Sequence, residues 1–200
     1  MEDLHDHHFM EVSYWSELWA ARDLRQKAAR YPSLKLNAQT EDEFRHAAML
    51  VDAMRGEGHR LRGSLANAMQ NAFFHRLGHL DLDGFGNESE ELFWGLHDVM
   101  ERRAIWCYKT YLRGGKVERY KATIRRILQD EKGHITEATS RHPKVRHLRH
   151  VDAQVFRRYI PSHFRDLNLI ARPEFWQSYF GGKLPELADI QNINSFCDVP

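Results

Sequence analysis

The chain has 200 residues, enough for one domain with a substantial core, and its formal net charge of +1 does not require a nucleic-acid or membrane partner. No apolar run approaches the ~20 residues of a membrane span, and the acidic, His-rich N-terminus lacks the pattern of a secretory signal. Two cysteines, Cys107 and Cys197, are too few for a disulfide framework, so we expect a reducing, cytoplasmic environment.

Apolar residues recur at three- and four-residue steps along most of the chain and predict an all-α fold. The first predicted helix covers residues 9–30. It ends at Tyr31-Pro32, because the residue before a proline avoids helical dihedral angles. Residues 1–8, which include three histidines, are expected to form a flexible tail.

The second predicted helix begins near Thr40. A threonine followed three residues later by Glu43 is typical of a capping box, with Thr40 as the N-cap. Gly56 and Gly58 end this helix, and an additional helix follows over residues 59–80.

Two further bundle helices are predicted over residues 88–112 and 117–138, separated by a Gly-Gly pair. Residues 9–140 would then form one four-helix bundle with a long crossover between its second and third helices. Residues 141–200, which are less regular and contain five prolines, are expected to add short C-terminal helices to the same domain.

A motif that occurs twice in the chain supplies candidate metal-binding residues. Asp42-Glu43 and Asp130-Glu131 are the two Asp-Glu dipeptides of the chain, and each has a histidine three residues after its glutamate, at His46 and His134. This spacing places a carboxylate and an imidazole one helical turn apart on the same side. Both pairs lie on apolar helix faces, where such groups are costly unless they are paired or bind a metal.

The other two bundle helices each place one glutamate in their inward stripe, Glu17 and Glu101. Glu11 is an alternative to Glu17 on the first helix. The order Glu, Glu-x-x-His, Glu, Glu-x-x-His is the ligand set of di-iron and di-manganese bundles. The predicted metal ligands are therefore Glu17, Glu43, His46, Glu101, Glu131 and His134. The competing interpretation is a plain bundle with surface Glu-His pairs.

Over about residues 9–139 the pattern resembles the ferritin-like superfamily. DEFRH at 42–46 is similar to the Asp-Glu-x-Arg-His signature of its oxygen-activating di-iron oxidases, and DEKGH at 130–134 differs in having Gly133 instead of Arg. The resemblance implies two iron ions, or a manganese-iron pair, and dioxygen as co-substrate. It also implies that Asp42 and Asp130 hydrogen-bond the histidines and fix their tautomers.

Three more residues are candidates for the site. His97 lies one turn before Glu101, as an extra ligand or, in the preferred interpretation, as a supporting or core histidine. Tyr14 and Tyr108 are candidate redox or hydrogen-bonding groups near the metals, with core tyrosines as the alternative. The pair His97-Asp98 also occurs in helical metal phosphohydrolases, but no further set of ligands supports that interpretation.

We therefore expect an O2-dependent di-iron oxidase or monooxygenase that oxidises a small-molecule or carrier-linked substrate through a bridging peroxide. Its electrons would come from an external reductase or ferredoxin, because the chain has no flavin or Fe–S motif. A monomer or homodimer is expected. One alternative is iron oxidation and storage or peroxide detoxification. Another is a tRNA-directed hydroxylase, because seven Arg and Lys residues in 141–165 could bind an anionic partner.

Overall fold

The computed structural model describes residues 3–61 and 111–141, and between them positions 93, 94, 97, 101, 104, 105 and 107–109. Every regular element in this part of the chain is a helix, in agreement with the predicted all-α class. None of the described helices is long and apolar enough to cross a membrane. The chain divides into two compact units, Met1–Gly78 with Gly115–Ile127 and His79–Gly114 with Leu128–Pro200.

Helix α1 (Asp3–Arg30) begins six residues earlier than predicted, so the expectation of a flexible tail over residues 1–8 is wrong for residues 3–8. The early start has a physical cause within the first unit. Asp6 is buried, and its carboxylate accepts hydrogen bonds from the backbone N–H groups of Lys116 (2.8 Å) and Val117 (2.9 Å). This interaction anchors the first turn of α1 beside the start of helix α5 (Glu118–Arg141).

The connection between the first two helices corrects the predicted capping box. Helix α1 ends at Arg30 before Pro32, as predicted, and a short 3-10 helix, η1 (Pro32–Leu34), follows. Helix α2 (Asn37–Gly56) then begins three residues before Thr40. Thr40 lies inside the helix, and its hydroxyl donates to the carbonyl oxygen of Leu36 at 2.8 Å. The chain can start α2 early because Lys35 adopts a left-handed conformation (φ 52°) that turns the backbone into the helix.

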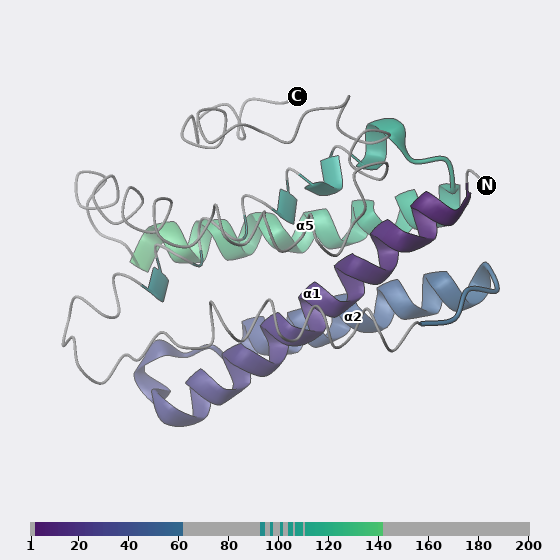
Figure 1. Cartoon of the computed structure of the whole chain (residues 1–200). Coiled ribbons are helices and arrows are strands. Elements are labelled where there is room, and N and C mark those ends of the chain that lie inside the picture. Colours follow the sequence, from purple (N-terminus) through teal and green to yellow (C-terminus); the bar gives the residue numbers. More distant parts are fainter. Residues whose placement is uncertain are drawn as a thin grey trace, which may run out of the picture. The chain divides into compact units, whose positions relative to one another are not determined.

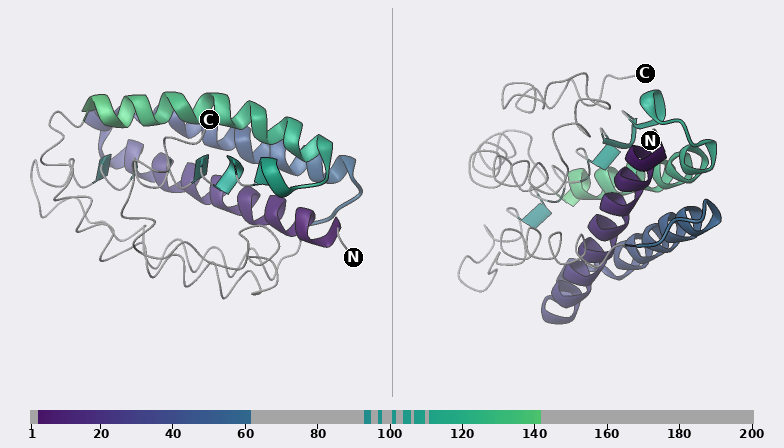
Figure 2. Two further views of the ribbon diagram at one scale, coloured as in Figure 1. Left: turned by 90° about the horizontal axis from the view of Figure 1, so that it is seen from above. Right: turned by 45° about the vertical axis from the view of Figure 1, so that its right-hand side comes forward.

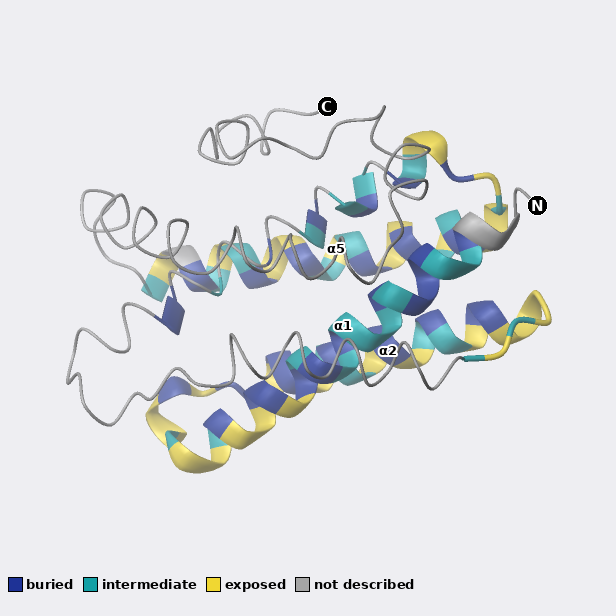
Figure 3. Ribbon diagram, viewed as in Figure 1, coloured by how far each residue is buried: buried dark blue, intermediate teal, exposed yellow. Residues whose placement is uncertain are grey.

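Helices α1 and α2 pack against each other as antiparallel neighbours (Figures 1 and 2). Figure 3 shows the buried residues of α2 along one side of the helix, with exposed residues on the other. Leu50 and Met54 lie in this buried stripe, and Met10 and Leu24 are buried on α1. Helix α2 ends at Gly56, and Gly58 takes a positive φ of 74° in the turn that follows. The end of the helix at this pair of glycines was predicted from the sequence.

The second unit contains the described positions from 93 to 114, all of them helical, and the C-terminal half of α5. Both agree with the helices predicted over 88–112 and 117–138. Trp94 is buried, and the guanidinium carbon of Arg141 lies 4.9 Å from the centre of its ring. Residues 59–61 are not helical, and the rest of the helix predicted over 59–80 lies outside the described residues, as does the extension after Arg141.

Candidate metal centre

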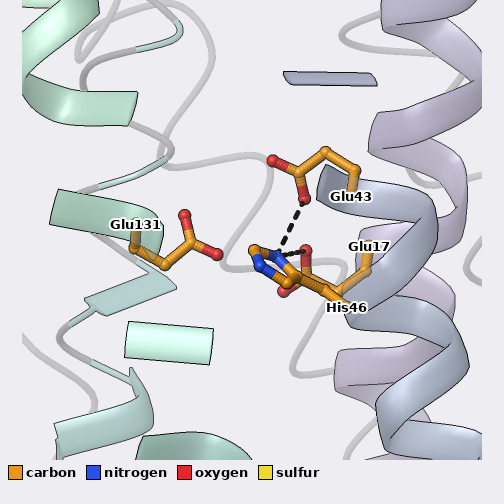
Figure 4. Close-up of side chains that lie close together, drawn as sticks. All are labelled: Glu17, Glu43, His46 and Glu131. Atoms are coloured by element: carbon orange, nitrogen blue, oxygen red, sulfur yellow. Dashed lines mark ion pairs between the residues drawn. The ribbon is translucent and has the colours of Figure 1, made fainter. Parts of the chain in front are cut away.

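The first unit brings together three of the predicted ligands, Glu17 from α1 and Glu43 and His46 from α2 (Figure 4). Glu43 and His46 are one helical turn apart, so both side chains leave α2 on the same side. The His46 Nδ1 atom lies 3.7 Å from Glu17 Oε2 and 3.8 Å from Glu43 Oε2. All three side chains are buried, His46 completely. We call Glu17, Glu43 and His46 the first triad.

The surroundings of the first triad disfavour the simultaneous ionisation of its two carboxyl groups. Burial, the nearby charge of Glu43 and a hydrogen bond with that carboxyl raise the pKa of Glu17 to about 8, although His46 acts in the opposite direction. Two carboxyl groups in one buried site cannot both ionise without a compensating cation. A divalent cation between them would supply that compensation.

The second unit holds the other three predicted ligands, Glu101, Glu131 and His134, which we call the second triad. His134 Nδ1 lies 3.2 Å from Glu131 Oε2 and 3.7 Å from Glu101 Oε1. Glu131 and His134 are one turn apart on α5, and all three residues are buried. The arrangement repeats that of the first triad, with two carboxylates and one imidazole.

His97 makes the second triad electrostatically different from the first. Its Nε2 atom lies 3.1 Å from Glu101 Oε1, and its ring stacks on Phe93 at a centroid distance of 5.8 Å. Desolvation by burial raises the pKa of Glu101. The charge of His97 and hydrogen bonds with His134, His97 and Glu131 outweigh that effect and hold the pKa well below its usual value. Glu101 is therefore ionised at neutral pH, whereas Glu17 is mostly protonated.

Each triad fits a transition-metal ion by its donor atoms. In each one, one ligand atom per residue lies within 4.8 Å of the others. Metal bonds to nitrogen and oxygen are about 2.0–2.2 Å long, so two ligand atoms on one ion lie roughly 3–4 Å apart. The measured separations of 3.2–3.8 Å between imidazole and carboxylate atoms fall in this range. Two carboxylates with one imidazole suit Fe(II) or Mn(II).

The remaining predicted site residues, apart from Tyr108, are less buried than the members of the triads. Asp42 is half-buried and forms an ion pair with the exposed Arg45, one turn along α2. Asp130 and Tyr14 are also half-buried, and Tyr108 is buried. The histidine-orienting role of the two aspartates and the redox role of the two tyrosines stay predictions.

Gly133, which takes the place of an arginine in the second motif, lies on the exposed side of α5. A Cβ atom built there would meet no atom within 4 Å among the described residues. The position could therefore accept a side chain, and the buried residues Glu131 and His134 do not require glycine between them.

The first unit contains a second group of interacting polar residues, whose contacts were not predicted from the sequence. Glu11, the alternative to Glu17, is fully buried, and its Oε2 atom lies 3.3 Å from His59 Nε2. The ring of His59 stacks on His7, and His7 Nδ1 is hydrogen-bonded to the hydroxyl of Tyr120. The four-residue step from His7 to Glu11 was a sequence signal for a shared helix face, but nothing in the sequence linked it to residues 59 and 120.

Comparison with protein-family models found no matching family, and comparisons with curated proteins and with solved structures found no significant match. The residues of the two triads, and their resemblance to a known ligand pattern, are therefore the features that point to a function. The basic segment 141–165 lies outside the described residues except for Arg141, whose guanidinium pairs with Glu137 at 2.8 Å.

Proposed function

We propose that the protein is an oxygen-activating di-metal enzyme of the ferritin-like type, an oxidase or oxygenase with two iron ions or a manganese-iron pair. The observation that carries this proposal is the repetition of one buried ligand set, two glutamates and one histidine, in both units. In each triad an Asp-Glu-x-x-His segment supplies two ligands and a second helical segment supplies the third. This repetition is the pattern of a di-metal carboxylate site.

Burial supports a metal role over a surface role. Glu43 is 3% exposed, Glu131 1% and His46 0%, so the plain-bundle alternative with surface Glu-His pairs does not fit these residues. Removing such charged groups from water costs several kcal/mol per ion unless they are compensated. When bound, a redox-active metal pair would supply the electrons that reduce dioxygen.

The residues of the chain would perform separate tasks in this enzyme. His46 and His134 would each anchor one ion. Glu17 would give up a proton when an ion enters, because its pKa of about 8 leaves it mostly protonated in the empty site. Glu101, already ionised and held by His97, would bind without losing a proton. This difference would make the two metal positions chemically distinct.

Metal loading tests the proposal directly. Anaerobic addition of Fe(II), followed by metal analysis, should give about two ions per chain. Glu43→Gln and Glu131→Gln should each lower this value, whereas Glu57→Gln, at an exposed position, should not. Unchanged metal content in the first two variants would exclude the triads as the binding site.

A second measurement tests whether the two triads share one centre. Ions joined by bridging carboxylates are magnetically coupled, whereas ions in two isolated sites are not. Mössbauer and EPR spectra of the loaded, oxidised protein should therefore show a coupled pair. Two uncoupled ferric ions would contradict a di-metal centre even if the stoichiometry were two. Iron oxidation that continues far beyond two ions per chain would instead indicate iron storage.

A further inference from the structure

The first unit contains a hydrogen-bonded cluster that the proposed metal site does not use: His7, Glu11, His59 and Tyr120. Tyr120 is completely buried on α5, and its hydroxyl is hydrogen-bonded to His7 Nδ1 on α1. The rings of His7 and His59 stack with centroids 4.6 Å apart and planes within 1° of parallel. His59 in turn faces the buried carboxylate of Glu11.

This geometry does not suit a metal ion. The lone pairs of an imidazole lie in the plane of its ring, so two stacked, parallel rings direct their nitrogen atoms along parallel planes and not toward one point. Tyr120 and His7 instead form the arrangement that a redox-active tyrosine requires. A buried phenol is difficult to oxidise unless a hydrogen-bonded base removes its proton, because the phenol radical cation is a very strong acid.

We propose that Tyr120 is a redox-active tyrosine and that His7 is its proton acceptor. In the oxidation step Tyr120 loses one electron to an oxidant, and its O–H bond breaks. The proton moves to His7 Nδ1, which leaves a neutral tyrosyl radical and a histidinium ion. The oxidant is a metal centre that dioxygen has oxidised and that gains the one electron, so this part of the proposal rests on the proposed function. Reduction of the radical returns the proton to Tyr120.

The other members of the cluster stabilise the charge that this step creates. His7 becomes positively charged in a partly buried location, where an isolated cation is costly. His59 presents its ring face to His7, and the carboxylate of Glu11, on the same helix as His7, lies 3.3 Å from His59 Nε2. We assign Glu11 and His59 as positioning residues, because they act on Tyr120 through His7.

Helix α1 carries members of both the cluster and the first triad. His7 and Glu17 are ten residues apart on one helix, a rise of about 15 Å at 1.5 Å per residue. Tyr14 lies three residues after Glu11 and three before Glu17, at helical neighbour spacing on either side. Tyr14 therefore lies along α1 between the cluster and the first triad.

The tyrosine-histidine pair is tested first without metal. Metal-free protein with ring-deuterated tyrosine is oxidised with a photogenerated ruthenium(III) tris-bipyridine complex and frozen for EPR. Seven tyrosines can contribute, so the signal is compared between variants. Tyr120→Phe should remove a distinct component of the tyrosyl spectrum, and Tyr111→Phe, a control at another fully buried tyrosine, should leave that component unchanged.

His7 is tested by substitution and rescue. His7→Ala should lower the yield of the Tyr120 component at least tenfold, and added imidazole should restore part of it. Circular dichroism checks that each variant keeps its helices, and His7→Gln, which retains a hydrogen-bonding side chain without a proton-accepting nitrogen, should show the same loss. An unchanged spectrum in Tyr120→Phe, or an unchanged yield in both His7 variants, would overturn the proposal.

The iron-loaded protein then separates this inference from the proposed function. After mixing with dioxygen and rapid freezing, the Tyr120 component should form in wild type and be absent in Tyr120→Phe. If ruthenium generates the component and the iron-loaded protein with dioxygen does not, the tyrosine-histidine pair is supported and the metal centre is rejected as its oxidant.

Discussion

Filling the first triad with a metal ion should release a proton from Glu17. With a pKa of about 8, this carboxyl group carries about 0.9 proton at pH 7 and about 0.1 at pH 9. A carboxylate must be deprotonated to ligate a metal. Ion binding at the first triad should therefore release close to one proton from Glu17 at pH 7 and almost none at pH 9. As the pH falls, the affinity should weaken about fivefold from pH 8 to 7 and about ninefold from pH 7 to 6, in proportion to the ionised fraction of Glu17.

Isothermal titration calorimetry in buffers of different ionisation enthalpy measures this proton count. Glu17→Gln should lower the release at pH 7 by about 0.9 proton, because glutamine carries no titrating group. Glu101→Gln is the matched control in the second triad. Since the pKa of Glu101 is held well below its usual value, that glutamate has no proton to release at pH 7. Equal proton release from wild type and Glu17→Gln would refute the reasoning.

The same group makes the stability of the metal-free protein depend on pH. Glu17 titrates near 4.5 in the unfolded chain and near 8 in the folded one, so between these values the folded state binds more protons. The free energy of unfolding should therefore fall as the pH rises from about 4.5 to about 8. Denaturant titrations should show a weaker pH dependence in Glu17→Gln, and an unchanged slope would contradict the assignment.

Three further predictions concern residues outside the triads. Gly133→Ala should stabilise the protein by about 0.5–1 kcal/mol in thermal unfolding and leave the metal content unchanged, because the position is open and helical; a loss of metal would show that glycine is required there. Asp6→Ala should destabilise the protein by about 1–2 kcal/mol, since two backbone N–H groups lose their acceptor; chemical denaturation with an unchanged midpoint would argue against the anchor. His97→Gln should weaken one of two metal-binding steps about 10- to 100-fold by removing the partner of Glu101; two unaltered steps in a metal titration would exclude that role.

Local sequence rules predicted the helices well where a single segment decides its own structure. Helix α1 ends before Pro32 and α2 ends at Gly56, both at residues whose backbone preferences act within one turn. One error occurred where a distant residue intervenes, and another where a neighbouring turn does. Asp6 contacts the backbone 110 residues away, so the first turn of α1 is held by an interaction that no local pattern contains. The capping box at Thr40 matched a valid local pattern, but the chain had already turned into the helix at Lys35.

The members of each triad were predictable in part because side chains that share one side of a helix obey a local spacing rule. Glu43 with His46 and Glu131 with His134 are one turn apart in sequence, and this spacing by itself places them on one side of a helix. The choice between Glu11 and Glu17 was different, since both are on the same helix and both are buried. Packing of α1 against α2 decided it by placing Glu17 beside His46 and leaving Glu11 to His59.

The sequence by itself therefore determined the helical class, the ends of the helices at proline and glycine, and the two Asp-Glu-x-x-His pairs. These features depend on backbone dihedral preferences and on the 3.6-residue period of the helix, both of which act over a few residues. The tertiary structure alone decided which third glutamate joins the first pair, that Glu101 is buried where its neighbours hold its pKa low, and that His7 meets Tyr120. Those outcomes depend on which side chains become neighbours in the packed protein, where burial and nearby charge set the pKa values.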